Sequence, residues 1–570
     1  MYKNNNVKIE NLKEMLEKSG KLYGDKQAYK IKIDKEKYIT YTHAEIRKNI
    51  NALGTALINL GLKDKRIAVI GENRLEWELA YLAVVCGTGV VVPFDKSLPE
   101  NELRDVIERS EVEAIFYSAK YESTLEKVKA EGVGKLKHLI SMDLEKHSNG
   151  NYSQKELIKT GKELLKDGNK EFINAKIDNE KMSIMLFTSG TTSKSKIVAL
   201  SHKNICTNLM DIAEVLDVNS NDIFLSFLPL HHVFECTVGF LFSLYVGAKT
   251  VFCDGIRHIP ENLKEYKVSV MACVPAIYER LFKIIRKHLS EKGELEEILE
   301  KEELLKNASM EEKRKAFDKI HKLFGGNIKL FISGAASLDA EIEQKFRNLG
   351  FNLVQGYGLT ETSPVVAIGT KENYKVGSIG KTVPSVEAKI INPNREGTGE
   401  LIVKGPSIML EYYKNKKATN EAVIDDWFYT GDLAKIDEDG FIFISGRKKS
   451  VIVLKNGKNI FPEEMEGLIN KIEGVEESFI YGKQISEDKN DIKINALIVY
   501  DEETVKNAYK VENEEEIYKA IRGKIKELNK LMPQYKAIRG IKITTKPLIK
   551  TTTNKIKRQA NLDEIKKFTN

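Results

Sequence analysis

The chain has 570 residues, too many for a single hydrophobic core, and this length implies several packed units. Apolar residues make up 42% and charged residues 30%, a soluble globular composition that excludes a fibrous or disordered chain. Lys and Arg outnumber Asp and Glu by only 90 to 83, giving a net charge of +7. We therefore expect no nucleic-acid partner, and a peripheral contact with a membrane stays open.

Cysteine usage and hydropathy indicate a compartment. The five cysteines include no CxxC pair, and an odd number argues against a disulfide framework. The N-terminus lacks an apolar signal region, and the most apolar stretch, Cys236–Ala248, is shorter than the roughly 20 residues that cross a bilayer. We expect a cytoplasmic protein without a transmembrane segment, at most peripheral at the inner membrane surface.

The first part of the chain predicts strands that alternate with helices. After an amphipathic opening helix near Leu12, the sequence predicts strand Arg66–Gly71, helix Leu75–Cys86, strand Val90–Val92, helix Leu103–Ser110 and strand Ala114–Tyr117. The same rhythm returns in residues 223–274 and 329–354. Such alternation is typical of parallel-rich sheets with packed helices, so the fold class expected for the large N-terminal domain is α/β.

One stretch interrupts this alternation. Residues 287–322 are dense in Glu and Lys and contain few aromatic residues. We interpret them as solvated helices that form a surface excursion before the strand expected at Leu330–Ser333. A contact with a partner or a membrane is the alternative.

The composition shifts again near Gly446. Charged helices there alternate with strands expected at Val451–Leu454, Ser478–Tyr481, Ile494–Tyr500 and Ile541–Thr544. We predict a large N-terminal domain over residues 1–446 and a small mobile α+β domain over residues 447–570.

A polar loop follows the strand expected at Ser183–Leu186. Residues 188–196 read Thr-Ser-Gly-Thr-Thr-Ser-Lys-Ser-Lys. Their hydroxyl and backbone N–H groups can donate to phosphate oxygens, and the lysines can offset the phosphate charge. The run does not fit GxxxxGK[ST], which disfavours the ordinary P-loop. On composition alone, a plain polar surface loop is an equally good interpretation.

A second motif, residues 355–364, reads Gln-Gly-Tyr-Gly-Leu-Thr-Glu-Thr-Ser-Pro. Gly356 and Gly358 flank Tyr357, so the backbone can approach a flat ligand and the ring can stack on a base. Glu361 is the one carboxylate in the run and can hold a hard cation such as Mg²⁺. The alternative is a plain turn between a strand and a helix.

Two further segments carry candidate residues. In Tyr429–Asp432, a carboxylate follows a glycine turn and can accept hydrogen bonds from the two hydroxyls of a ribose, although Asp after Gly is also ordinary turn chemistry. Arg447 follows Asp432 by fifteen residues. The segment Leu228–Glu235 contains His232, for which a core histidine is the alternative.

The polar loop and the second motif together resemble the adenylate-forming superfamily, which includes acyl-CoA synthetases, luciferases and nonribosomal adenylation domains. The family pattern of the loop is close to TSGTTGxPKG. The chain departs from it at Ser193, Ser195 and Ile197, where the family usually has Gly, Pro and Gly. The residues that it keeps, and that the resemblance assigns to phosphate binding, are Thr188, Ser189, Gly190, Thr191, Thr192 and Lys196.

The resemblance also implies a nucleotide and metal site. Tyr357 is expected to pack on adenine beside Gly358, Thr360 to bond the α-phosphate and act in catalysis, and Glu361 to bind Mg²⁺. Asp432 and Arg447 are expected to hold the ribose hydroxyls. The residues that resemble the lining of the adenine and carboxylate pocket are Gly334, Ala335 and Ala336.

For the small domain, the resemblance implies rotation between two half-reactions. Lys449 matches the hinge, and Gly457 lies in a turn that faces the active site during thioester formation. Lys555 matches the catalytic lysine that bridges the carboxylate and the α-phosphate, with Asn554 in place of the usual glycine. In the large domain, His232 matches a catalytic-site histidine near the acyl carbonyl.

The resemblance covers the chain from about Leu12 to Arg558, and its nearest subgroup is the long-chain fatty acyl-CoA synthetases. It implies an acid–thiol ligase that uses ATP, Mg²⁺ and coenzyme A to convert a fatty acid into acyl-CoA, AMP and pyrophosphate. Apolar segments 238–246 and 270–277 are candidates for the wall of an alkyl tunnel, and equally for core. An aryl-CoA ligase, an acyl–acyl carrier protein ligase and a nonenzymatic nucleotide- or lipid-binding relative are the alternatives.

Overall fold

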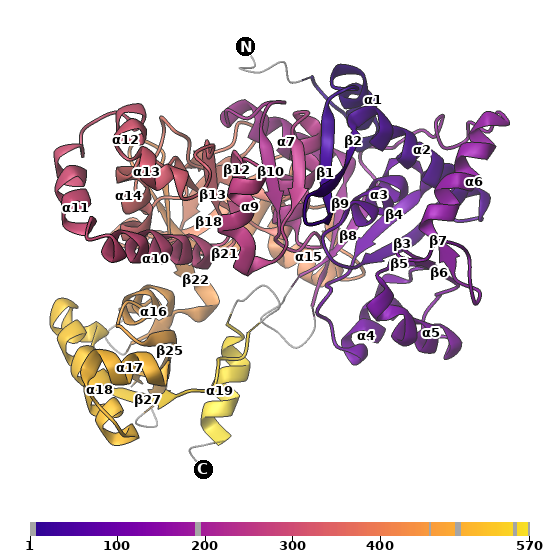
Figure 1. Ribbon diagram of the computed structural model, residues 1–570. Coiled ribbons are helices and arrows are strands. Elements are labelled where there is room, and N and C mark those ends of the chain that lie inside the picture. The colour runs from indigo at the N-terminus through magenta and orange to yellow at the C-terminus, as the bar shows by residue number, and fades with distance from the viewer. Residues whose placement is uncertain (1–6, 189–194, 455–457, 485–491, 551–555, 568–570) are drawn as a thin grey trace. The chain divides into compact units, whose positions relative to one another are not determined.

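The computed structural model describes residues 7–188, 195–454, 458–484, 492–550 and 556–567. The chain divides into two compact units (Figure 1). The first unit comprises residues 1–188, 196–387 and 403–428, and the second comprises residues 189–195, 388–402 and 429–570. Within the part of the chain that the structure describes, no helix is both long enough and apolar enough to span a bilayer.

The first unit contains two sheets in which parallel strands predominate, so the α/β class predicted for it is confirmed. The larger sheet has nine strands, and its antiparallel pairs lie at the two edges. In order across the sheet, these strands are β16 (Lys381–Thr382), β15 (Val365–Ile368), β14 (Leu353–Gly358), β13 (Leu330–Ser333), β12 (Val270–Cys273), β10 (Ile223–Ser226), β11 (Lys249–Phe252), β1 (Gln27–Asp34) and β2 (Lys37–Thr42).

The second sheet of this unit has eight strands. β8 and β9 form an antiparallel pair, and β19 adds to the outer side of β9. In order, the strands are β19 (Glu411–Tyr412), β9 (Ile197–Ser201), β8 (Met182–Phe187), β4 (Gly89–Pro93), β3 (Lys65–Ile70), β5 (Ala114–Tyr117), β6 (His138–Ser141) and β7 (Tyr152–Ser153).

Helices connect the parallel strands, and local capping sets where several of them begin. The Ser201 hydroxyl at the end of β9 accepts the Asn204 N–H, so the chain passes from strand directly into helix. The helices of this unit are α1 (Leu12–Leu22), α2 (His43–Asn59), α3 (Leu75–Ala83), α4 (Glu100–Ser110), α5 (Glu122–Ala130), α6 (Gln154–Lys166), α7 (His202–Val215), α8 (Phe242–Tyr245), α9 (Ile259–Glu265), α10 (Pro275–Glu291), α11 (Leu295–Leu304), α12 (Met310–Ala316), α13 (Asp318–Lys322), α14 (Ala340–Asn348) and α15 (Lys416–Ala422).

The alternation predicted for residues 66–117 is confirmed, but the first predicted helix ends early. α3 stops at Ala83, and residues 84–88 form a π-helical turn. The Thr88 hydroxyl donates to the Ala83 carbonyl at 2.8 Å, and Gly87 has a φ of 147° that an α-helix cannot contain. A second π-helix, Glu235–Leu241, follows the segment that carries His232.

The charged insertion is helical and mostly exposed, as predicted, but part of it packs into the core. Phe317 and Ile320 are 1% and 2% exposed, and both belong to a core cluster with Tyr278 and Leu281 of α10. A charge-rich composition conceals this because a single apolar side chain in each turn is enough to dock a short helix.

A five-stranded sheet has the order β17 (Glu387–Ile391), β18 (Gly399–Lys404), β21 (Trp427–Ile436) and β20 (Val423–Ile424), with β22 (Ile442–Arg447) also paired to β21. The rest of the second unit is α+β, as predicted. Its strands and helices are β23 (Ile452–Val453), β24 (Asn459–Ile460), β25 (Val475–Gln484), β26 (Ile492–Tyr500), β27 (Gly540–Thr544), α16 (Pro462–Ile469), α17 (Glu502–Tyr509), α18 (Glu514–Leu531) and α19 (Arg558–Lys567).

Candidate active site

Three of the segments singled out in the sequence lie along one edge of the larger sheet. β10, β12, β13 and β14 are neighbours in that order, and the pairs among them are parallel. The carboxyl ends of parallel strands therefore meet at the same edge, which is where ligands bind in open α/β sheets. Residues 227–234 follow β10, residues 334–336 follow β13, and residues 356–358 end β14.

The predicted phosphate loop connects two strands of the second sheet. β8 precedes it and β9 follows it, and the Thr188 N–H donates to the Lys196 carbonyl at 2.9 Å, which closes the base of the loop. The strand predicted before the loop is confirmed. The four central residues assigned to phosphate binding lie outside the described residues: Ser189, Gly190, Thr191 and Thr192.

One tyrosine joins the phosphate loop to the predicted metal residue. The Lys196 ammonium lies 4.1 Å from the centroid of the Tyr412 ring, and the Tyr412 hydroxyl donates to Glu361 Oε1 at 2.7 Å. Sequence reasoning missed Tyr412. Its only local signal is a pair of tyrosines, and the pairing of β19 with β9 that places it cannot be read from one sequence.

The second motif has the close backbone contacts that its glycines suggest. A Cβ atom at Gly358 would lie 1.8 Å from the Pro364 carbonyl oxygen, so only glycine fits there. Tyr357 precedes it and is half-buried at the end of β14, in register with Ala367. Thr360 and Glu361 follow in a single 3₁₀ turn, and both side chains are half-buried.

The segment after β13 is packed against the segment that carries His232. A Cβ atom at Gly334 would lie 2.8 Å from the Phe234 ring, and Ala335 has a φ of 68°. Ala336, the third residue assigned to this pocket, is exposed. His232 Nδ1 accepts the Phe234 N–H at 3.3 Å, so the neutral ring carries its proton on Nε2. The structure thus brings these two segments together.

The other histidine of the pair has a carboxylate partner. His231 Nε2 lies 3.5 Å from Oδ1 of Asp95, and both side chains are largely buried. Asp95 follows β4, the neighbour of β8 in the second sheet. This contact connects the carboxyl ends of strands from the two sheets, and no local pattern identified Asp95 in the sequence.

Buried polar groups fix the base of the histidine segment. Asn73 Nδ2 donates to Ser226 Oγ at 3.0 Å and to the Leu228 carbonyl at 2.6 Å. The Ser226 hydroxyl in turn donates to Glu235 Oε1 at 2.6 Å. Complete burial raises the pKa of Glu235 to about 8, so this carboxyl is protonated at neutral pH.

The predicted ribose pair is formed in the second unit. Asp432 and Arg447 are in register on β21 and β22, and Arg447 Nε lies 2.9 Å from Asp432 Oδ1. The side chain of Asp432 is 4% exposed, whereas that of Arg447 is 44% exposed. The Asp432 N–H also donates to Thr430 Oγ1 at 3.0 Å, which orients the turn. A buried carboxylate with a cation beside it is a suitable acceptor for a diol.

The remaining predicted residues of the small domain are placed in part. Lys449 is exposed in a 3₁₀ turn directly after β22. Gly457 and Lys555 lie outside the described residues. The flanks of the segment that carries Lys555 are paired, because the Lys557 N–H donates to the Ile549 carbonyl at 2.9 Å.

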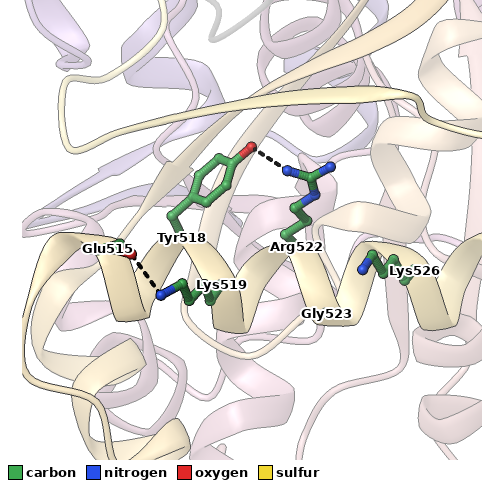
Figure 2. A pocket seen from close by; sticks show the side chains of 6 residues that line it. All are labelled: Glu515, Tyr518, Lys519, Arg522, Gly523 and Lys526. Carbon is green, nitrogen blue, oxygen red and sulfur yellow. Dashed lines mark hydrogen bonds and ion pairs between the residues drawn. The ribbon is translucent and has the colours of Figure 1, made fainter.

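A shallow pocket on α18 is lined by none of these residues. Figure 2 shows its polar lining. Lys519 pairs with Glu515 at 2.6 Å, and Arg522 Nη1 donates to the Tyr518 hydroxyl at 3.2 Å. Neighbours on the same helix thus engage these two cations, which is the pattern of a solvated helix face.

The described residues include no cluster of three or more His, Cys, Asp or Glu side chains arranged to hold a metal ion. Glu361 nevertheless fits Mg²⁺, which proteins commonly bind through one or two carboxylates together with substrate phosphates. The hydroxyl of Tyr412 occupies only one of the two Glu361 oxygens. The second oxygen is the one that suits a cation.

Comparison with known proteins agrees with this geometry. Residues 16–413 match the AMP-binding enzyme family, and residues 449–568 match the AMP-binding enzyme C-terminal domain. Fatty acyl-CoA synthetase B of Dictyostelium discoideum is 30% identical over 83% of this chain and 75% of its own length. A long-chain-fatty-acid–CoA ligase of Salmonella typhimurium is 26% identical over 82% of both chains.

Solved structures share the fold. ATP-bound MatB of Rhodopseudomonas palustris has a TM-score of 0.75 and 22% identity, covering 98% of this chain and all of its own. A fatty acyl CoA synthetase of Mycobacterium tuberculosis has a TM-score of 0.64 and 20% identity, with 99% of each chain covered. Because one family model spans well over half of its length, the chain belongs to the AMP-binding enzyme family and has the fold of adenylate-forming enzymes.

Proposed function

We propose that the protein activates a fatty acid with ATP as its acyl-adenylate and transfers the acyl group to coenzyme A. The products are pyrophosphate in the first half-reaction and acyl-CoA with AMP in the second. One observation carries the proposal: Lys196 and Glu361 meet at Tyr412 in a chain whose relatives over most of its length are named fatty acyl-CoA or long chain acyl-CoA synthetases.

The first half-reaction brings a carboxylate oxygen to the α-phosphorus of ATP, and both groups are negatively charged. Positioned cations and hydrogen-bond donors are therefore the main requirement. In this proposal Thr360 bonds the α-phosphate, and Lys196 offsets the charge of the departing pyrophosphate. The donors of the polar loop are Thr188, Ser189, Gly190, Thr191 and Thr192.

Glu361 is the proposed magnesium ligand. When bound, Mg²⁺ would neutralise charge on the phosphate oxygens of the nucleotide. The Tyr412 hydroxyl supports this role because its hydrogen bond engages Oε1 of the carboxylate and not Oε2.

The nucleotide itself has proposed contacts at its base and at its ribose. Tyr357 would pack on adenine where Gly358 permits close approach, and Asp432 with Arg447 would bind the ribose hydroxyls. The residues proposed to line the adenine and carboxylate pocket are Gly334, Ala335 and Ala336.

The second half-reaction requires a different set of residues. We propose that residues 447–570 form a mobile domain that turns about Lys449, because Lys449 lies in an exposed turn at the end of β22. Lys555 would serve adenylation, and the turn at Gly457 would serve thioester formation. His232 would lie near the acyl carbonyl, which is supported by the packing of Phe234, two residues further on, against Gly334 after β13.

The proposed substrate is a fatty acid with a long alkyl chain. Apart from Val274, which is partly exposed, and Ala276, which is exposed, the two apolar segments named for a tunnel wall, residues 238–246 and 270–277, are buried. Each methylene that leaves water contributes about 0.8 kcal/mol. We therefore expect kcat/KM to rise with the length of the alkyl chain of the acid.

Pyrophosphate release tests the proposal across acids from acetate to oleate, with benzoate included and with or without coenzyme A. We expect palmitate to be turned over faster than acetate or benzoate, and thioester to form only with coenzyme A. A flat or falling profile between six and sixteen carbons would refute the long-chain assignment, and preference for benzoate would indicate an aryl-CoA ligase. Thioester formed only with acyl carrier protein would reassign the acceptor.

A matched pair of variants controls this assay. Lys196→Gln should lose most pyrophosphate release, whereas Lys203→Gln should retain it, because Lys203 pairs with Glu180 at 2.7 Å on the surface of α7. No pyrophosphate from any acid in the wild-type protein would favour a nonenzymatic binding protein.

A further inference from the structure

We propose that Tyr412 is a positioning residue that keeps the Lys196 ammonium and the Glu361 carboxylate apart, so that both charges remain available to the nucleotide and its metal. The inference rests on the proposed function and adds a residue to it.

The side chain of Tyr412 touches both charged groups with different parts. Its ring face lies 4.1 Å from the Lys196 ammonium, and its hydroxyl donates to Glu361 Oε1 at 2.7 Å. The residue is only 5% exposed, so both contacts are shielded from water. A phenol donates to a carboxylate with one hydrogen, which leaves the second carboxylate oxygen free of this bond.

The ring also acts as a spacer. Although both charged groups contact the Tyr412 side chain, Lys196 and Glu361 form no ion pair within 4.0 Å among the residues that the structure describes. Without a spacer, an ammonium and a carboxylate in a poorly hydrated site attract each other strongly. A direct ion pair would neutralise both groups and compete with the phosphates and the metal ion for them.

The backbone around Tyr412 holds the ring in place. β19 pairs with β9 so that Tyr412 is in register with Val198, two residues beyond Lys196. The Tyr412 N–H donates to Thr419 Oγ1 at 2.9 Å, and the Tyr413 N–H donates to the Ile197 carbonyl at 2.8 Å. Tyr412 therefore lies on the strand paired with β9, and Lys196 directly precedes β9.

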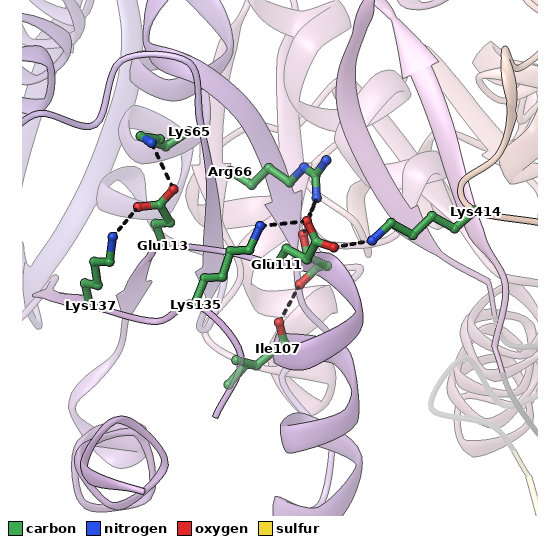
Figure 3. Close-up of polar contacts among 9 residues, drawn as sticks. Lys65, Arg66, Ile107, Glu111, Glu113, Lys135, Lys137 and Lys414 are labelled. Carbon is green, nitrogen blue, oxygen red and sulfur yellow. Dashed lines mark hydrogen bonds and ion pairs between the residues drawn. The ribbon is translucent and has the colours of Figure 1, made fainter. Parts of the chain in front are cut away.

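Lys414, two residues after Tyr412, belongs to a cluster of charged side chains that Figure 3 shows. Lys414 pairs with Glu111, which also lies 2.9 Å from Arg66 and 3.2 Å from Lys135. The hydrogen bond from Lys414 lowers the pKa of Glu111 to about 2, so the anchor stays charged at neutral pH. The Arg66 guanidinium lies 4.8 Å from the centroid of the Tyr413 ring. These contacts limit movement of the chain directly after Tyr412.

Two substitutions separate the two roles. Tyr412→Phe removes the hydroxyl but retains the spacer ring, whereas Tyr412→Leu removes both. Tyr413→Phe is the matched control, because it removes the hydroxyl of the neighbouring ring and leaves the ring under Arg66. Circular dichroism and thermal melting verify that each variant folds.

Calorimetric titration of the full chain with ATP measures nucleotide affinity independently of turnover. It is carried out once in excess Mg²⁺ and once in EDTA. We expect Tyr412→Phe to weaken binding of Mg·ATP by about tenfold, since a hydrogen bond to a charged group is lost. Binding of metal-free ATP should change less than about twofold, because Lys196 keeps its aromatic contact. Higher Mg²⁺ should restore binding to this variant.

Tyr412→Leu should weaken binding under both conditions, because Lys196 and Glu361 can then pair directly. Equal weakening of Mg·ATP and metal-free ATP by Tyr412→Phe would overturn the inference, as would wild-type affinity in both variants. If Tyr412→Leu does not fold, the Phe variant and its Mg²⁺ dependence decide the matter. Failure of the wild-type protein to bind ATP at all would instead overturn the proposed function.

Discussion

The ion pair between Asp432 and Arg447 allows stability and nucleotide binding to be tested in the same variants. Because the Asp432 side chain is 4% exposed and the Arg447 side chain 44% exposed, the two partners should respond unequally to removal. Arg447→Ala leaves a buried carboxylate without its ion pair, at a cost of about 1–3 kcal/mol. Asp432→Asn leaves a guanidinium that water can reach, at a cost of about 0–1 kcal/mol.

Asp432→Asn, which should cost little stability, should have a large effect on nucleotide binding. If Asp432 accepts the ribose hydroxyls, Asp432→Asn replaces charge-assisted hydrogen bonds with weaker neutral ones. A hydrogen bond to a charged group contributes about 1.5–3 kcal/mol, so ATP affinity should fall by about 10-fold to 100-fold. Asp426→Asn is the matched control, because its carboxylate is 83% exposed in a surface pair with Lys404.

Calorimetric melting and ATP titration of each single variant and of the double variant provide the measurements. The double variant should recover part of the stability that Arg447→Ala loses, because no buried charge is then left without its partner. Equal destabilisation by the two single substitutions would refute the burial argument. Unchanged ATP affinity in Asp432→Asn would refute the ribose assignment, whatever its stability.

Three further predictions concern other parts of the molecule. The native pKa of Glu235 is about 8 against an ordinary value of 4.5, so the native state holds an extra proton between these pH values and its stability should fall as pH rises through them. The melting temperature of Glu235→Gln relative to wild type should therefore increase from pH 5 to pH 9. A difference in melting temperature that does not depend on pH would contradict this. Glu361→Gln should abolish most pyrophosphate release without a large change in melting temperature, because Gln can still accept the hydroxyl bond; early melting would mark Glu361 as structural. Lys555→Ala should lower the rate of adenylation by about 100-fold or more yet still form thioester from supplied acyl-adenylate. Lys449→Pro should instead release one pyrophosphate per site and transfer little acyl group to coenzyme A. Equal loss of both steps in Lys555→Ala would exclude domain rotation as proposed.

Local patterns were sufficient to predict much of the fold. The strand expected at Ala114–Tyr117 has these same bounds in the structure, and so does the strand expected at Leu330–Ser333. Both are short apolar runs between polar turns, a signal that depends only on neighbouring residues. The helix predicted to reach Cys86 ended at Ala83 because Gly87 and the Thr88 hydroxyl override apolar periodicity.

The charged insertion shows where composition misleads. Its Glu and Lys content predicted a solvated excursion, yet Phe317 and Ile320 are buried in the core beside α10. Whether an apolar side chain on a short helix faces water or core depends on what packs against it. That neighbour is distant in sequence and invisible to a local window.

The sequence by itself determined the α/β class, the polar loop, the second motif and the turn at Asp432, since each is a run of adjacent residues. Only the tertiary structure decided that Tyr412 contacts both Lys196 and Glu361, and that Asp95 faces His231. The physical reason is that strand pairing and sheet order bring together segments far apart along the chain. Local residue patterns specify strands, but the partners of each strand depend on the packing of the whole unit.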